Sequence, residues 1–198
     1  MENLQYPINF IFNISTIAND FKATDTQGKT IAYVKQKLFK LKEDITVYSN
    51  ESKTQVNYKI NADRWIDFSA AYSIKNSSNA EIGKVARKGW KSIWKTEYEI
   101  ISKHQKLQYY VREDNAWVKV FDGILAQIPI LNFFTGYFFN PSYSVIDLYG
   151  KSILNMKKEA SFFGRKFKLS KLDTIKSEDE ESIILSLMMM VLLERRKG

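Results

Sequence analysis

The most constraining feature of this chain is an apolar segment close to its C-terminus. From Ile183 to Leu193 the only polar residue is Ser186. A helix on the surface of a protein carries a polar stripe that recurs every three or four residues, and this segment has no such stripe. We therefore expect it to be enclosed by other parts of the protein. As a helix it would be about 16 Å long, which is roughly the depth of the interior of a small barrel.

The residues on both sides of this segment predict a single helix over about residues 177–197. Ser177 and Glu180 have the spacing of a capping box. Residues 178–181 are all acidic and residues 195–197 are all basic. Both ends therefore carry charges of the sign that stabilises the helix dipole.

Three segments of the chain share one spacing of turn-forming residues. Each has an aromatic residue, Asp or Asn four positions later, Gly or Asn three positions further on, and Ile after another three. The segments are Phe21, Asp25, Gly28 and Ile31; Tyr72, Asn76, Asn79 and Ile82; and Tyr143, Asp147, Gly150 and Ile153. An Asp or Asn side chain can accept a hydrogen bond from the backbone two residues on, and Gly or Asn tolerates the left-handed conformation of a short hairpin loop. The spacing therefore predicts a β-hairpin that is used three times.

Most of the remaining chain has the alternation of apolar and polar residues that is typical of short strands. The aromatic content of 14% is high, which also favours strands. Further strands are predicted at residues 8–15, 29–37, 38–41, 45–49, 55–60, 68–75, 81–88, 94–101, 107–112 and 166–172. With the third hairpin the total is about a dozen, which indicates a sandwich or a barrel. Residues 115–127 are predicted to form a helix.

The sequence offers few groups for catalysis or metal binding. The chain has no cysteine, which excludes disulfides, thiolate-bound metals and cysteine nucleophiles and fits a reducing compartment. The single histidine, His104, lies in a polar turn, and there is neither a Walker loop nor a GxGxxG motif. The carboxylate pairs Glu43–Asp44 and Glu113–Asp114 are expected in solvated turns. We therefore expect no catalytic residues, no metal and no cofactor.

No segment predicts targeting or a membrane span. The N-terminus lacks the basic region and the cleavage site of a signal peptide. Residues 123–139 are uncharged but contain Pro129, and the apolar part of the terminal helix is shorter than the roughly 20 residues that cross a bilayer. We expect a cytoplasmic protein that is not integral to a membrane. The sequence leaves open whether residues 123–139 pack inward or lie on a membrane.

The formal net charge of +8 favours anionic partners. Two basic clusters accompany aromatic residues: Lys84, Arg87, Lys88, Lys91 and Lys95 with Trp90 and Trp94, and Lys157, Lys158, Arg165, Lys166 and Lys168 with Phe162 and Phe163. Cations beside exposed aromatic rings suit an anionic membrane interface. In the alternative interpretation the lysines are solvated strand faces and the aromatic rings belong to the core. Single-stranded nucleic acid would use the same groups, but no RNA-binding signature accompanies them.

The hairpin segments and the terminal helix together resemble the tubby C-terminal-like superfamily, in particular its LURP-one-related and phospholipid-scramblase-like branches. The resemblance is carried by residues 21–41, 72–88, 143–158 and 164–169 and by the helix from Ser177. It implies one domain over residues 1–198, in which a closed antiparallel barrel of about twelve strands encloses the terminal helix. Members are associated with phosphoinositide binding at membranes, with proposed lipid scrambling, or with no established activity. The short terminal helix argues against scrambling, because a scramblase helix would have to lie in the bilayer.

These observations predict a mostly β protein that acts as a non-enzymatic binding module with a basic rim. The expected partner is an anionic phospholipid headgroup, such as that of a phosphoinositide, or a membrane-associated protein. The candidate contacts are Lys84, Arg87, Lys88, Lys91, Lys95, Lys157, Lys158, Arg165 and Lys166. The alternative is a structural or protein-interaction domain without a lipid ligand, and an enzyme that uses carboxylates alone is a third hypothesis. The expected location is the cytoplasm, including the surface of a membrane.

Overall fold

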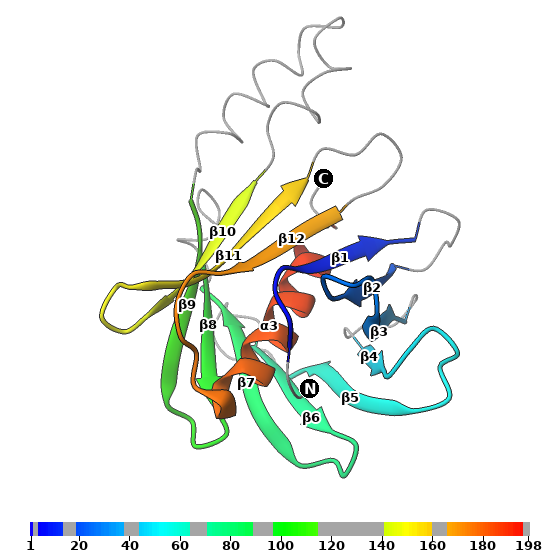
Figure 1. Cartoon of the computed structure of the whole chain (residues 1–198). Helices are drawn as coiled ribbons and strands as arrows, with labels where there is room; N and C mark the ends of the chain where they lie inside the picture. Colours follow the sequence, from blue (N-terminus) through cyan, green and yellow to red (C-terminus); the bar gives the residue numbers. More distant parts are fainter. Residues whose placement is uncertain are drawn as a thin grey trace, which may run out of the picture.

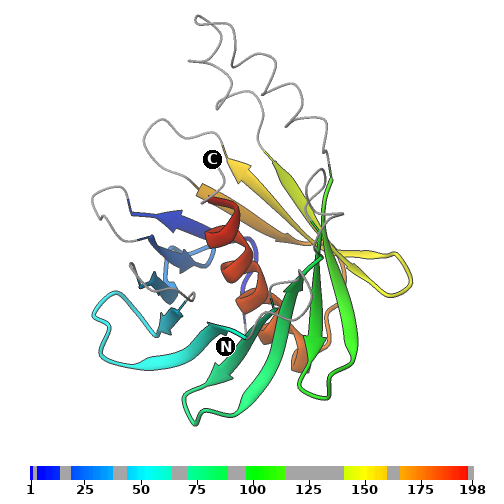
Figure 2. The same ribbon diagram turned by 180° about the vertical axis from the view of Figure 1, so that it is seen from behind.

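A computed structural model describes residues 1, 4–13, 19–37, 44–63, 71–88, 97–114, 141–159 and 166–195. Within these segments twelve antiparallel strands follow one another around a closed barrel, and β1 completes the ring by pairing with both β2 and β12. One helix, α3, lies inside the barrel (Figure 1, Figure 2). The elements are β1 (Ile8–Phe12), β2 (Asp20–Thr24), β3 (Thr30–Gln36), β4 (Asp44–Tyr48), β5 (Val56–Ala62), β6 (Ala71–Asn76), β7 (Glu81–Arg87), β8 (Glu97–Ser102), β9 (Leu107–Glu113), β10 (Ser142–Asp147), β11 (Ser152–Glu159), β12 (Lys166–Lys171) and α3 (Ser177–Arg195).

This architecture confirms the predicted mostly β fold, with a closed barrel around a C-terminal helix. The observed strands differ from the predicted ones only near their ends, where local pattern is weakest. The strand predicted at residues 68–75, for example, begins at Ala71. The predicted strand at residues 38–41, the predicted helix at 115–127 and the uncharged segment at 123–139 lie outside the described residues.

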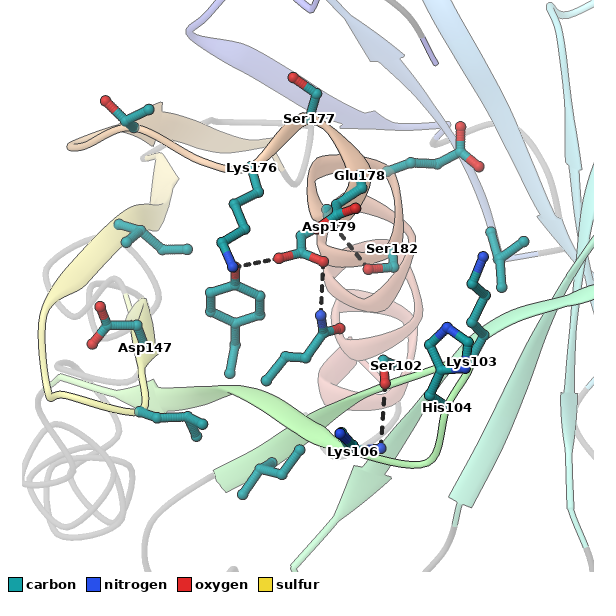
Figure 3. A pocket seen from close by; sticks show the side chains of 18 of the residues that line it. Ser102, Lys103, His104, Lys106, Asp147, Lys176, Ser177, Glu178, Asp179 and Ser182 are labelled. Atoms are coloured by element: carbon teal, nitrogen blue, oxygen red, sulfur yellow. Dashed lines mark hydrogen bonds between the residues drawn. The ribbon is translucent and has the colours of Figure 1, made fainter.

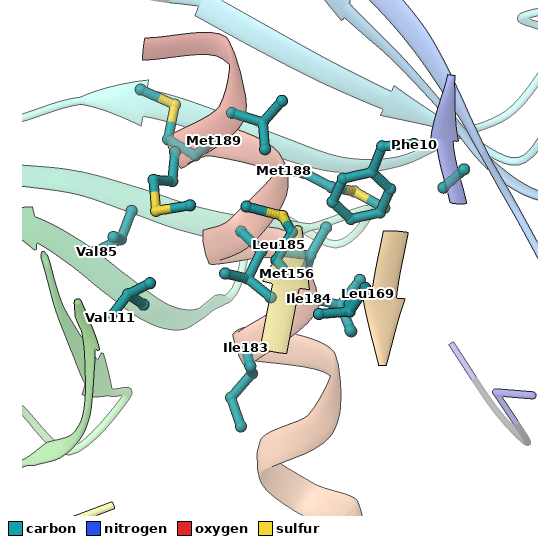
Figure 4. Close-up of a cluster of buried hydrophobic side chains, with 14 of the residues drawn as sticks. Phe10, Val85, Val111, Met156, Leu169, Ile183, Ile184, Leu185, Met188 and Met189 are labelled. Atoms are coloured by element: carbon teal, nitrogen blue, oxygen red, sulfur yellow. The ribbon is translucent and has the colours of Figure 1, made fainter. Parts of the chain in front are cut away.

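The apolar segment of α3 is buried on every side, as its sequence predicts. Residues 183–192 are each at most 1% exposed to solvent. The strands can surround the helix because every second residue of a strand points to the same face of the sheet. Figure 4 shows side chains from five strands gathered beside the helix: Phe10, Val85, Val111, Met156 and Leu169. The one polar residue, Ser186, donates its hydroxyl proton to the carbonyl oxygen of Ser182 at 2.7 Å, so its burial leaves no unsatisfied donor.

The helix contacts β7 and β8 most extensively. At Gly83 on β7, a Cβ atom would lie 3.0 Å from the carbonyl oxygen of Ile101 and 3.6 Å from the Cβ of Ser182. The first distance is too short for an ordinary contact, so any larger residue would displace the backbone of β8. Glycine at this position therefore allows the backbone of β8 to approach β7 closely, while a Cβ atom would be in ordinary contact with Ser182 of α3.

Four of the hairpins at one end of the barrel have the same turn. In each, the backbone N–H of the fourth turn residue donates to the carbonyl oxygen of the first, at 2.9–3.1 Å. The fourth residue is left-handed in all of them: Gly28 (φ 79°), Asn79 (φ 63°), Gln105 (φ 58°) and Gly150 (φ 88°). The side chains of the first residues, Asp25, Asn76, Ser102 and Asp147, accept a hydrogen bond from the N–H four residues on, at 2.9–3.2 Å.

The three hairpins predicted from the repeat are therefore confirmed, and their geometry extends to a fourth. The turn that begins at Ser102 escaped the sequence pattern because Ser replaces Asp or Asn and Gln105 replaces Gly or Asn. The three aromatic residues of the repeat, Phe21, Tyr72 and Tyr143, are all buried in the core. The repeat thus supplies both the turn and the first core side chain of each hairpin.

We expect opposite changes in stability when the left-handed positions of two of these turns are altered. Gly28→Ala should lower the free energy of unfolding by about 1 kcal/mol, because a Cβ at this φ is strained although no atom lies within 4 Å of it. Gln105→Gly should raise it by about 0.5 kcal/mol, since it removes the same strain at the cost of a more flexible unfolded chain. Urea unfolding of both variants measures these changes. A loss of stability in Gln105→Gly would contradict the assigned turn geometry.

Candidate functional site

The outer surface of β11, β12 and β1 carries the most basic part of the predicted site, and we call it the lysine face. Its outward side chains are Asn155, Lys157, Glu159, Lys166, Lys168, Ser170, Asn9 and Ile11. Lys157 and Lys168 stand directly opposite each other in the β11–β12 register, so their Cβ atoms are about 5 Å apart. Both side chains are exposed, and neither forms an ion pair with any residue of the described segments.

The other cations near this pair are neutralised by carboxylates. Lys166 lies 2.9 Å from Glu159, which is also its cross-strand partner. Lys22, on β2, lies 3.4 Å from Glu51. The lysine face therefore has a centre of two uncompensated positive charges, with compensated charges around it.

The predicted cluster at β7 has a different character, because its two described lysines, Lys84 and Lys88, are paired with carboxylates. Lys84 lies 3.6 Å from Asp63 and 3.8 Å from Glu81. Lys88 contacts Glu97 at 2.9 Å and Glu99 at 3.0 Å. The hydrogen bonds that Lys88 donates to these two carboxylates raise its pKa. These lysines are therefore held by strand partners rather than presented freely to solvent.

The same interactions also shift the pKa of Glu97. Burial favours the neutral form of Glu97, but the cations of Lys88 and Arg112 outweigh it and lower the pKa of this carboxyl. Lys88 also lies 4.9 Å from the ring centre of Tyr110. The outer surface of β7, β8 and β9 is thus a network of compensated charges.

Two further predicted contacts lie on the inner side of the sheet. Arg87 is paired in register with Tyr98, which is fully buried, and Lys158 is paired with the buried Phe167. Lys91, Lys95 and Arg165, with the aromatic residues near them, lie outside the described residues. Since β7 and β11 are separated by three strands of the ring, the two predicted clusters do not form one surface.

Glu113 was expected in a solvated turn, and the structure corrects this. It is the last residue of β9 and is fully buried. It lies two residues after Val111 on the strand, so its side chain points to the same inner face of the barrel. Nearby, Tyr98 donates a hydrogen bond to Glu194 of α3 at 2.8 Å. Asp114 does lie at the end of the strand, where it accepts a hydrogen bond from Ser142 at 2.6 Å. Sequence alone could not separate these adjacent carboxylates, since one residue of register exchanges inside and outside.

A cavity of about 870 Å³ opens at the end of the barrel where α3 begins. It is lined by the β8–β9 turn, the β10–β11 turn, the connection from β12 to α3 and the first turns of α3 (Figure 3). Asp179 of α3 is anchored in its wall by hydrogen bonds from Gln108 and Tyr109, each of 2.7 Å. His104 also lines the cavity. Sequence analysis missed this site, although an exposed Leu148–Tyr149 pair in a turn was an available signal.

Neither a metal site nor a membrane-spanning helix is found in the described segments. No group of three or more His, Asp or Glu residues there is arranged to hold a metal ion. None of the helices in this part of the chain is long and apolar enough to cross a membrane.

Comparison with known proteins gives a fold but no family. No family model matches the chain, and no curated protein matches it. Its structure is similar to the X-ray structure of a protein from Arabidopsis thaliana, with a TM-score of 0.51 and 14% sequence identity over 98% of this chain and 93% of that one. At this identity the likeness shows a shared fold alone.

Proposed function

We propose that this protein is a non-enzymatic binding module that engages anionic phospholipid headgroups through its lysine face. One observation carries the proposal. Lys157 and Lys168 are directly opposed, exposed and unpaired among the described residues, while Lys84, Lys88 and Lys166 of the predicted rim have carboxylate partners.

An opposed pair of like charges destabilises a sheet unless something lies between them. A phosphate group bound by both ammonium groups would remove that repulsion, and each lysine near an anionic membrane contributes about 1 kcal/mol of attraction. The neighbours Ser170 and Asn9 add uncharged hydrogen-bonding groups on the same face, whereas the side-chain amide of Asn155 already donates to Asp114 and Ser142, each at 3.0 Å. A headgroup with more than one phosphate, such as that of a phosphoinositide, suits two adjacent cations best.

The architecture supports a family assignment as part of the same proposal. A closed barrel around an apolar C-terminal helix is what resemblance to the tubby C-terminal-like superfamily, with its LURP-one-related and phospholipid-scramblase-like branches, implies. The apolar part of α3 is enclosed by the strands, which favours binding at a membrane surface over insertion of that helix into a bilayer. The proposed location is the cytoplasm, at the surface of a membrane.

The proposal predicts that reversing the two central charges abolishes binding to anionic vesicles. In the Lys157→Glu/Lys168→Glu variant, affinity for phosphatidylcholine vesicles that contain phosphatidylserine or a phosphoinositide should fall by more than about tenfold. Both side chains are exposed, so the fold should be unaffected. Co-sedimentation with vesicles, compared with phosphatidylcholine alone, measures the change.

A matched control variant distinguishes binding by the lysine face from a general effect of net charge on binding. Lys59 and Lys75 are also directly opposed, on β5 and β6, but Glu81 stands opposite Lys75 on its other side. Lys59→Glu/Lys75→Glu changes the net charge by the same amount and should reduce binding by less than about threefold. Equal losses in the two variants, or no charge-dependent binding by the native protein, would refute the lysine face as a lipid site. The latter result would favour a protein-interaction domain without a lipid ligand.

A further inference from the structure

The cavity beside the start of α3 has the size of a ligand site. Its volume of about 870 Å³ falls in the range of about 300–1,000 Å³ that is usual for pockets that hold small molecules. The cavity lies at the end of the barrel and is formed by connections and by α3 (Figure 3). The lysine face is formed instead by the outward side chains of β11, β12 and β1. The two are therefore separate surfaces.

One edge of this cavity, formed by the β10–β11 turn, carries exposed apolar side chains. Tyr149 is 96% exposed and Leu148 55% exposed, and both line the cavity. An ion pair between Lys151 and Asp173 joins this turn to the connection that follows β12. Among the described residues, exposed large hydrophobic side chains occur only here and at Leu172 in the same connection. Apolar groups gathered at one exposed place indicate a contact site.

Three of the four carboxylates that line the cavity are already engaged. Asp147 accepts hydrogen bonds from the backbone N–H groups of Tyr149 and Lys151, each of 2.9 Å. Asp179 accepts hydrogen bonds from Gln108 and Tyr109. The carboxylate of Glu181 lies 2.6 Å from the amino group of Met1. These three carboxylates cannot readily serve as partners for a cationic ligand.

The cations that line the cavity are, in contrast, available. Lys103, Lys106 and Lys176 are exposed, and none of them forms an ion pair with another described residue. Glu178 is the one carboxylate in the lining that is likewise exposed and forms no ion pair with a described residue. The uncommitted charge of the cavity is therefore positive, with three ammonium groups against one carboxylate.

We infer that this cavity binds an amphipathic organic anion, in which a carboxylate, sulfonate or phosphate group is attached to an aromatic or aliphatic body. The apolar body lies against Leu148 and Tyr149, and the anionic group faces the lysines of the β8–β9 turn and Lys176. A flat bilayer surface would not fill a cavity of this volume, whereas a single such molecule does. The ligand is either a free metabolite or one lipid molecule taken from a membrane. The inference does not depend on the lysine face.

Titration with anilinonaphthalene sulfonate, an aromatic anion that fluoresces when bound, tests this assignment. Tyr149→Ser and Lys103→Glu/Lys106→Glu should each weaken its binding by about tenfold. The altered side chains are exposed, so both variants should remain folded. His104 is the only histidine of the chain and lines the cavity, so its imidazole C–H resonances can be assigned without ambiguity in the proton NMR spectrum and should shift on titration.

The Lys157→Glu/Lys168→Glu variant is the matched control, and it should keep the affinity of the native protein for the dye. A loss of vesicle binding through the lysine face can therefore be distinguished from a loss of dye binding in the cavity.

Vesicles that contain phosphatidic acid identify the source of the ligand. Weaker vesicle binding by Lys103→Glu/Lys106→Glu assigns a lipid, and unchanged binding assigns a free anion. Unchanged dye affinity in both cavity variants, or an unmoved His104 resonance at saturation, would overturn the inference.

Discussion

The Leu187→Asp variant should lose its cooperative fold. Leu187 lies in the middle of the enclosed part of α3 and is fully buried, so aspartate there would place an unpaired carboxylate among apolar side chains. The cost is several kcal/mol for the buried polar group, added to the lost burial of leucine. Proteins of this size are stable by only about 5–15 kcal/mol. Far-ultraviolet circular dichroism during heating should therefore show no sharp transition.

Two other substitutions make this test specific. Leu187→Ala should destabilise the protein by about 2–5 kcal/mol and leave it folded, because it creates a cavity without a charge. Leu172→Asp makes the same chemical change at a site that is 57% exposed and should alter stability by less than about 0.5 kcal/mol. If Leu187→Asp showed a sharp thermal transition with the same amplitude as the native protein, this result would show that the barrel does not enclose the helix.

Raising the pH above 10 should unfold the protein steeply. Among the residues that the structure describes, six tyrosines have a pKa above the ordinary value of 10: Tyr6, Tyr33, Tyr58, Tyr98, Tyr109 and Tyr143. Burial is the main cause in each, and a nearby carboxylate adds to it. For Tyr33, burial and the hydrogen bond to Asp20 raise the pKa to about 12.

Stability falls as the pH rises because the folded state favours the protonated form of these tyrosines. Below pH 10 the tyrosines are neutral in both states, and their contribution to stability is complete. Above pH 10 the unfolded chain releases protons that the folded chain retains, so stability falls until the pH exceeds the folded pKa values. Each such tyrosine removes at most about 1.4 kcal/mol per pH unit. Even half of the six would remove a typical stability within roughly two or three pH units.

The experiment is a base titration that follows the ultraviolet absorbance of tyrosinate and circular dichroism together. The part of the absorbance change that comes from these six tyrosines should coincide with the loss of circular dichroism, because they ionise only on unfolding. Tyr143→Phe removes one of the retained protons and should make the transition less steep. Ionisation of all tyrosines while the circular dichroism of the folded barrel persists would be inconsistent with their burial.

Much of the fold follows from local sequence. The enclosed helix was predictable because its apolar residues occupy every side of a helical turn. Three hairpins were predictable because left-handed backbone demands Gly or Asn at a fixed place. The fourth hairpin was not predicted as a repeat, since Gln105 adopts φ 58° under the constraint of its strands rather than by its own preference.

Less of the candidate site could be predicted. Lys157 and Lys158 are neighbours in sequence, yet one is exposed on the lysine face and the other is paired with Phe167 on the inner side. Lys88 belongs to a basic cluster in sequence, but carboxylates of the adjacent strand compensate it. These differences arise from strand register, which a single sequence does not reveal.

The residues alone indicated that about a dozen short strands enclose an apolar helix, because turns, alternation and an all-apolar segment are properties of neighbouring residues. The three-dimensional structure was needed to show that these strands close into a barrel, which of the described lysines lack an ion-pair partner, and where a cavity opens. Free charges and cavities depend on which residues the strand register and the connections bring together, such as Lys157 opposite Lys168 on β11 and β12, or Tyr149 and Lys176, which line one cavity.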